Sequence, residues 1–234
     1  MEKLKDSKNR NTLYIGLVAL LFVALVIGIV ISNHKRSQQL QNSQTTTVTS
    51  AEVQKLTRNI EDDPQAVGKT HAPVTMIEYS DLRCPYCAQL YTTSETKILS
   101  EFVDTGKLRI EMRNYPILGD ESVLAAHAAV AAGKQGKYFQ FVNKIYQNAP
   151  SQGHLELDDK TLINFASAVG VPNIEKFTSD MKSKSVADEV QKDIDEGQKL
   201  GVQGTPTVFI NGVKVDSPSY DSIAQAINQQ LEHK

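Results

Sequence analysis

The chain has 234 residues, of which 25 are Lys or Arg and 27 are Asp or Glu, so its formal net charge is −2. The 40% hydrophobic content is that of a globular protein and excludes wholesale disorder. The near-neutral charge argues against nucleic acid as a main ligand, because phosphate binding needs a basic excess. Two cysteines are too few for a multi-disulfide scaffold or a four-thiolate zinc site.

The first predicted element is a membrane segment at residues 13–31, LYIGLVALLFVALVIGIVI, which contains no charge. As a helix rising ~1.5 Å per residue it would span about 28 Å, close to the ~30 Å hydrocarbon core of a bilayer. A buried core helix and a cleaved signal peptide are the alternatives, but signal peptides usually have a shorter apolar region and a small-residue cleavage site. Four basic residues precede the run and two follow it, which predicts a cytoplasmic N-terminus and an extracytoplasmic remainder.

The predicted anchor divides the chain into four parts. Residues 1–12 are expected to form a cytoplasmic tail. Residues 32–59 are expected to form a flexible spacer, because their central part, SQQLQNSQTTTVTS, is polar and poor in large apolar side chains. The folded domain is expected at residues 60–232. If the predicted orientation holds, both cysteines lie in a compartment where disulfides persist.

Within the domain, hydrophobic periodicity predicts strands that are separated by helices. Asn211-Gly212 is a strong hairpin signal, and the charged residues Asp193, Asp195 and Glu196 are expected on a solvated helix face. The expected elements are a buried strand at 73–79, a helix at 88–103, a half-buried strand at 108–115, a mostly helical block at 120–197, strands at 206–210 and 213–215, and a helix at 220–231. This order predicts a mixed α/β domain with helices packed on a sheet.

The only two cysteines form a C-x-x-C motif, Cys84-Pro85-Tyr86-Cys87, between the first strand and its helix. At a helix N-terminus the free N–H groups and the dipole stabilise a thiolate, which is the form that attacks disulfides. We therefore expect Cys84 to be the nucleophile and Cys87 the more buried resolving thiol. A structural metal site and an inert disulfide are the alternatives. Zinc needs three or four ligands, and a disulfide closing so short a loop stabilises little.

Two segments together resemble a known family: residues 78–87, EYSDLRCPYC, and residues 201–212, GVQGTPTVFING. Residues 60–231 are similar to DsbA-type thioredoxin-fold oxidoreductases, in particular the membrane-anchored BdbD-like type of Gram-positive bacteria. The resemblance implies a thioredoxin-like fold with a helical insertion at about 117–197. It also implies oxidation of exported proteins with free thiols, and reoxidation by a quinone-linked membrane partner.

The same resemblance implies three further site residues. Pro206, preceded by Thr205, matches the family's cis-proline, whose loop lies beside the cysteine pair and binds an extended substrate peptide. An ordinary turn before a strand is the alternative interpretation. Glu78 matches a buried acid near the active site, where it would transfer protons or tune Cys87. Alternatively, Glu78 simply faces solvent.

The residues between the cysteines depart from the most oxidising member of the family. DsbA has Pro-His there and a nucleophile pKa near ~3.5, whereas this chain has Pro85-Tyr86, and Tyr86 offers only a neutral phenol. We expect Cys84 to be less acidic than in DsbA, with the charge of Arg83 favouring its thiolate. Pro85, Tyr86 and Thr205 are expected to contact substrate.

The interpretation that the sequence and the resemblance favour is a membrane-bound, monomeric thiol:disulfide oxidoreductase that introduces disulfides into exported proteins. It needs neither a cofactor nor a metal, and it does not bind nucleic acid. Two alternatives stay open. A disulfide reductase or isomerase would use the same residues with the reduced pair as the working form. An anchored peptide-binding or chaperone-like domain would use the groove beside Pro206 without redox chemistry.

Overall fold

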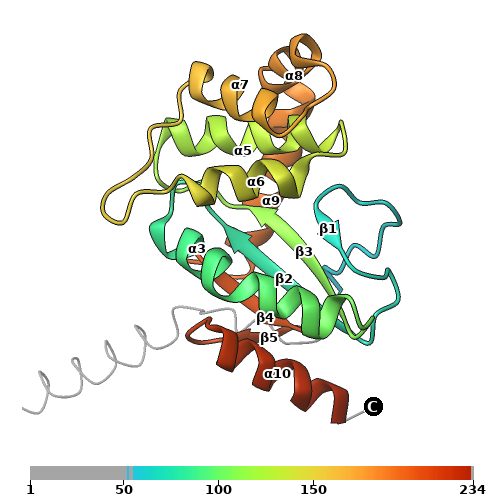
Figure 1. The fold of residues 1–234 in the computed structure, drawn as a ribbon. Helices are drawn as coiled ribbons and strands as arrows, with labels where there is room; N and C mark the ends of the chain where they lie inside the picture. Colours follow the sequence, from blue (N-terminus) through green and yellow to red (C-terminus); the bar gives the residue numbers. More distant parts are fainter. Residues whose placement is uncertain (1–51, 53–54, 233–234) are drawn as a thin grey trace, which may run out of the picture. The chain divides into compact units, whose positions relative to one another are not determined.

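The structure is a computed structural model that describes residue 52 and residues 55–232. Its domain is built on one five-stranded sheet with the strand order β1-β3-β2-β4-β5 (Figure 1). The strands β2 and β3 run parallel, and the other neighbouring pairs run antiparallel. The strands are β1 (Ala66–Val67), β2 (Val74–Ser80), β3 (Leu108–Asn114), β4 (Thr207–Ile210) and β5 (Val213–Val215).

The helix that follows β2 is continuous but contains two π-helical turns. Its parts are α3 (Pro85–Leu90), η1 (Tyr91–Glu95), α4 (Thr96–Ile98) and η2 (Leu99–Val103). An all-helical stretch separates β3 from β4, and a final helix follows β5. These helices are α5 (Asp120–Gly133), α6 (Tyr138–Gln147), α7 (Asp159–Ala168), α8 (Ile174–Met181), α9 (Lys184–Lys199) and α10 (Tyr220–Glu232). The arrangement confirms the thioredoxin-like fold with a helical insertion.

The two faces of the sheet are covered by different helices. Because side chains alternate along a strand, Val74 and Met76 of β2 join the large apolar core under the α3–η2 helix and α10. Ile77 and Tyr79 point to the opposite face, where a smaller cluster includes Phe209 and α9 packs on β3 (Figure 1). The whole of β2 is therefore buried, as its apolar sequence predicts.

Most predicted elements are confirmed, with boundaries that move by one or a few residues. Asn211 and Gly212 have φ values of 44° and 85°, and their positive sign suits the two-residue hairpin turn that the sequence predicts. The strands differ from the prediction in two respects. The short strand β1 is missed, because two residues carry no periodic signal. The strand β3 is buried on both faces instead of one, because its polar side chains have polar partners inside the protein.

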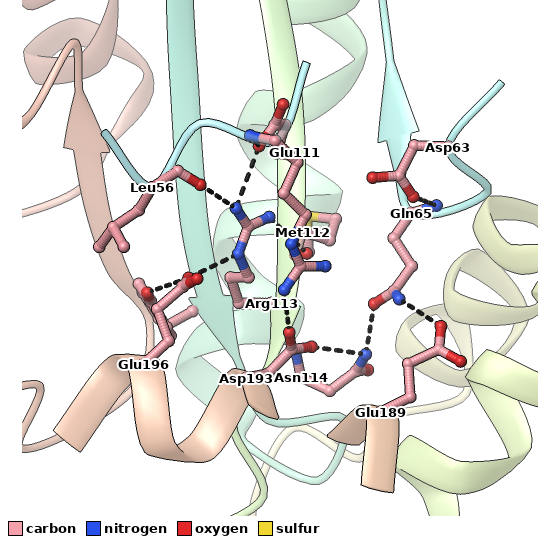
Figure 2. Close-up of polar contacts among 12 residues, drawn as sticks. Leu56, Asp63, Gln65, Glu111, Met112, Arg113, Asn114, Glu189, Asp193 and Glu196 are labelled. Carbon is pink, nitrogen blue, oxygen red and sulfur yellow. Dashed lines mark hydrogen bonds and ion pairs between the residues drawn. The ribbon is translucent and has the colours of Figure 1, made fainter. Parts of the chain in front are cut away.

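Those polar partners form a buried cluster on the α9 side of the sheet (Figure 2). The guanidinium of Arg113 on β3 donates to Glu196 of α9 at 2.7 Å, to Glu111 at 3.0 Å and to the backbone oxygen of Leu56 at 2.9 Å. Arg113 is fully buried. Unpaired, such a charge would be costly, so the two carboxylates and the carbonyl are what allow its burial.

The cluster continues beyond Arg113. The side-chain amide of Asn114 donates to Gln65 at 2.6 Å, and its backbone N–H donates to Asp193 at 2.8 Å (Figure 2). Asp193 also pairs with Arg58. The predicted solvated face of α9 is therefore wrong for Asp193 and Glu196. A charge-rich helix sequence normally indicates a solvent-exposed face. The sequence of α9 alone cannot show that the charged strand β3 packs against this face.

The N-terminal predictions lie mostly outside the described residues. These include the predicted tail at 1–12, the anchor at 13–31 and most of the spacer. No helix within the described part of the chain is long and apolar enough to cross a membrane. Residues 56–59, which the sequence assigns to the spacer, contact β3, since the backbone N–H groups of Arg58 and Asn59 donate to Glu111 at 2.9 and 3.1 Å.

Candidate active site

The C-x-x-C motif lies where β2 ends and α3 begins. Cys84 is the N-cap residue of α3 and Pro85 follows in the first turn, where a missing N–H removes no helical hydrogen bond. Both cysteines are free thiols. Cys87 is completely buried, Cys84 is nearly so, and Tyr86 between them is 69% exposed. Both thiols are thus buried, and Cys87 is the more buried of the two, as the sequence predicts.

The surroundings of Cys84 favour its thiolate. A hydrogen bond from the Cys87 thiol lowers the pKa of Cys84 to about 6, with further donation from Thr205 and from the backbone N–H groups of Cys87 and Tyr86. Burial opposes this shift but does not cancel it. The value lies between an ordinary cysteine and the pKa of ~3.5 known for DsbA. That Pro-Tyr gives a weaker thiol acid than Pro-His stays a prediction.

The side chain of Arg83, whose charge is expected to favour the Cys84 thiolate, contacts groups outside the cysteine motif. Its guanidinium donates to the backbone oxygens of Leu118 and Leu155, both at 3.0 Å, and pairs with Glu121 at 3.0 Å. The groups that lower the Cys84 pKa most are the Cys87 thiol, Thr205 and the backbone N–H of Cys87. Proximity in sequence to a cysteine does not determine where a long side chain points, and here Arg83 ties the motif to the helical stretch after β3.

Cys87 has the opposite electrostatic environment. Burial raises its pKa well above the ordinary value, and both the hydrogen bond to Cys84 and the charge on Cys84 act in the same direction. A hydrogen bond from the hydroxyl of Ser80 partly offsets these effects. The two sulfurs therefore differ strongly in acidity, and at neutral pH the reduced pair holds one thiolate, on Cys84, and one thiol, on Cys87.

Glu78 is linked to Cys87 through Ser80, which lies two residues later on the same face of β2. Glu78 and Ser80 share the face that the α3–η2 helix covers, and Glu78 is only 7% exposed, so it does not face solvent. The Ser80 hydroxyl donates to Glu78 Oε1 at 3.0 Å and is 3.1 Å from the Tyr146 hydroxyl of α6. Burial raises the pKa of Glu78 to about 7, although the Ser80 hydrogen bond lowers it.

Ser80 and Tyr146 are site residues that the sequence analysis missed. Ser80 could have been found, because it lies two positions after Glu78 in a predicted strand and so must share its face. Tyr146 lies 66 residues after Ser80, in α6, and only the folded chain brings the two hydroxyl groups together.

The loop before β4 lies beside Cys84. The Thr205–Pro206 peptide bond is cis, as the resemblance implies, and the Cys84 sulfur is 3.3 Å from the Thr205 backbone oxygen. Pro206 and Tyr86 line a surface pocket of about 330 Å³, and Tyr86 and Pro85 line a second one of about 840 Å³ with Tyr146. Exposed Tyr86 therefore stands between two hollows that flank the motif.

A metal site would need several suitable side chains together. Within residues 55–232 and at residue 52, no three His, Cys, Asp or Glu side chains are arranged to hold an ion. The groups that gather around the motif are Cys84, Cys87, Glu78, Thr205 and Pro206, and their chemistry is that of a dithiol with one activated sulfur and one buried acid.

The acidity of Cys84 can be measured directly. We expect alkylation of the reduced, full-length protein by iodoacetamide to occur at Cys84 and to rise through a midpoint near pH 6, because only the thiolate reacts. The same chain unfolded in urea serves as the control and should show a midpoint near the ordinary value of about 8.5. Equal midpoints in the folded and unfolded chains would contradict the assigned environment.

Comparisons with known proteins agree with this geometry. A family model described as thioredoxin matches residues 61–229. The chain is 34% identical over 171 residues to the probable disulfide bond formation protein D of Bacillus cereus, which covers 72% of this chain and 79% of that protein. It is also similar to the crystal structure of oxidised BdbD from Bacillus subtilis, with 27% identity, a TM-score of 0.68, and coverage of 72% of this chain and 92% of that chain.

A second solved structure, that of Wolbachia pipientis alpha-DsbA1, is 25% identical with a TM-score of 0.64 and covers 72% of this chain and 91% of that one. The match of the family model extends from before β1 into α10 and so includes both the cysteine motif and the Thr205–Pro206 loop. The chain therefore belongs to the thioredoxin family, and within it to the DsbA-like thiol:disulfide oxidoreductases.

Proposed function

We propose that this protein is an extracytoplasmic oxidase that introduces disulfides into exported proteins through the Cys84–Cys87 pair. The observation that carries the proposal is the unequal acidity of the two thiols, with the pKa of Cys84 lowered to about 6 and that of Cys87 raised. A stabilised thiolate stabilises the reduced form, and a disulfide whose reduced form is stable is readily donated.

In the proposed reaction, a substrate thiolate attacks the sulfur of Cys84 in the oxidised pair. The Cys84–Cys87 bond breaks, Cys87 leaves as a thiolate and takes up a proton, and Glu78 serves as the nearby acid. A second substrate thiolate then attacks the substrate sulfur of this mixed disulfide and expels Cys84, whose low pKa makes it a good leaving group. The substrate has lost two electrons, and the cysteine pair has gained them.

Substrate is proposed to bind as an extended segment along the Thr205–Pro206 loop, with Pro85 and Tyr86 contacting it. The position of the Thr205 backbone oxygen next to Cys84 supports this assignment, since a peptide paired with this loop would pass beside the reactive sulfur. The two surface pockets on either side of Tyr86 provide room for substrate side chains.

The proposed cellular setting comes from the N-terminal sequence. Residues 13–31 anchor the protein in the cell membrane, residues 1–12 stay in the cytoplasm, and residues 32–59 link the anchor to the catalytic domain at 60–232 outside. Relatives named disulfide bond formation protein D support the disulfide chemistry of that domain. We further propose that the protein is a monomer and that a quinone-linked membrane protein reoxidises it.

The reduction potential of the Cys84–Cys87 pair in the full-length protein tests the oxidase assignment. We expect a value above about −180 mV after equilibration with glutathione, but below the ~−120 mV of DsbA, because Tyr86 cannot stabilise the thiolate as an imidazole does. A value near the ~−270 mV of thioredoxin would make the dithiol the working form and favour a reductase.

A further inference from the structure

Glu95 is a carboxylate in a place where the helix pattern favours an apolar side chain. It lies eight residues after Cys87, with Tyr91 halfway between them, so all three share the inward face of the helix. Its Oε1 atom is buried and has no hydrogen-bond partner within the described part of the chain. Glu95 also ends the π-helical turn η1 (Tyr91–Glu95), and such turns occur frequently at functional sites.

An unpartnered buried carboxylate oxygen is costly to keep, so its retention calls for a role. Burial raises the pKa of Glu95 to about 9, and the charge of Glu78 raises it further in the same direction. The charges of both carboxylates also raise the pKa of Tyr91. The two acids therefore lie close enough to interact through the low-dielectric interior, and Tyr91 lies near both.

Glu95 also lies where water can reach it. It lines a surface cavity of about 340 Å³ between β1 and α6. Three of the lining residues, Pro64, Gly136 and Gln140, are exposed to solvent. The titratable groups facing the two acids are Asp63 before β1, Tyr91, Tyr138 and Tyr146 of α6, and Cys87. No Lys, Arg or His is among the cavity-lining residues, so nothing there holds Glu95 as a paired anion.

We propose that Glu95 is the solvent-side end of a proton relay in which Glu78 and Ser80 connect Cys87 with the cavity between β1 and α6. The inner part of the relay consists of Glu78 Oε1, which lies 3.0 Å from Ser80 Oγ, and of Ser80, which forms a hydrogen bond with Cys87. When Glu78 is protonated, its hydroxyl donates to Ser80, and the single Ser80 proton is then free to be donated to Cys87. A water molecule between the two carboxyl groups completes the path, with the free Oε1 atom of Glu95 as its acceptor. This inference rests on the proposed function, because a relay matters only if Cys87 gains and loses protons.

The proton balance of the relay is simple. When a thiolate opens the Cys84–Cys87 disulfide, Cys87 leaves as a thiolate. Ser80 gives it a proton and takes one from Glu78, Glu95 restores the proton of Glu78, and cavity water restores that of Glu95. The path runs in reverse when the pair is reoxidised. Glu95 touches no reacting atom and acts only through Glu78.

The variant E95Q tests the relay, because Gln fills the same space but cannot carry the proton. Oxidised full-length protein is reduced by excess dithiothreitol, and single-turnover rates are read by acid quench and alkylation. Rates are divided by the concentration of dithiothreitol thiolate at each pH. We expect the wild-type rate to fall only above about pH 9, where the carboxyl pair loses its last proton. The E95Q rate should fall above about pH 7, where Glu78 alone loses its proton.

One pH unit above the pKa of Glu78, E95Q should therefore be about tenfold slower than the wild-type protein, because only about a tenth of Glu78 is then protonated. E95D keeps a carboxyl group, so its rate should again fall only above about pH 9, as in the wild-type protein. E101Q removes an exposed glutamate of the same helix and should leave the profile unchanged. If the role of Glu95 were purely structural, E95Q would not change the pH above which the rate falls.

An E95Q profile that superimposes on that of the wild-type protein overturns the relay, and so does an E95D profile that follows E95Q. The proposed function is tested separately, by the ability of the oxidised wild-type protein to form disulfides in a reduced, unfolded test protein. If the wild-type protein does not form these disulfides, the oxidase assignment is refuted whatever the pH profile. If it does form them and the pH profile of E95Q equals that of the wild-type protein, only the relay is refuted.

Discussion

Replacing Cys87 by Ser is expected to trap the protein in covalent complexes with its substrates, whereas Cys84→Ser abolishes both the complexes and the catalytic activity. Cys84 has the lowered pKa and is 5% exposed, whereas Cys87 has the raised pKa and is completely buried. A disulfide formed with Cys84 has no resolving thiol in Cys87→Ser and therefore persists. In Cys84→Ser, the remaining thiol is both inaccessible and protonated, because its pKa is raised.

These outcomes can be read by non-reducing gel electrophoresis of the full-length variants after incubation with a reduced substrate protein. A reductant added to one half of each sample should release the trapped substrate from Cys87→Ser. The double variant, which has no thiol, is the matched control and should form no complex. Complexes that accumulate on Cys84→Ser instead would show that the roles of the two cysteines are reversed.

Arg113→Met is expected to destabilise the domain by about 3–5 kcal/mol, the usual cost of removing one partner from a buried ion pair. Met fills much of the same volume, but it leaves Glu111 and Glu196 without the hydrogen bonds at 3.0 and 2.7 Å that Arg113 provides. It also frees the backbone oxygen of Leu56, which is one of several contacts that hold the segment before β1. At roughly 2–4 °C per kcal/mol for a domain of this size, Tm should fall by about 10 °C.

Denaturant unfolding of the full-length protein, followed by circular dichroism, measures this change. Lys184→Ala is the control, because Lys184 forms an exposed pair with Asp188 four residues later, and such helix pairs contribute only about 0.3–0.5 kcal/mol. If Arg113→Met unfolds at the same denaturant concentration as Lys184→Ala, the cluster around Arg113 does not stabilise the fold in the way that its contacts indicate.

The sequence predicted the architecture well because its signals are local. The apolar run at 73–79, the helix after the cysteines and the Asn211-Gly212 turn each depend on residues that are neighbours in the chain. The resemblance added the cis bond at Pro206, which spacing alone could not distinguish from a turn. Predictions failed where the deciding partner was distant, as for β1, which pairs with β3 about 40 residues later, and for the inner face of α9.

The sequence by itself determined which sulfurs this protein has, where they stand relative to a strand and a helix, and hence that it can exchange disulfides. The tertiary structure alone decided how the two thiols differ, because pKa shifts depend on burial and on hydrogen bonds from distant segments. Thr205 reaches Cys84 from 121 residues away, Ser80 joins Glu78 to Cys87, and Arg83 turns away from the site. Electrostatics act through space, and spatial neighbours exist only after the chain has folded.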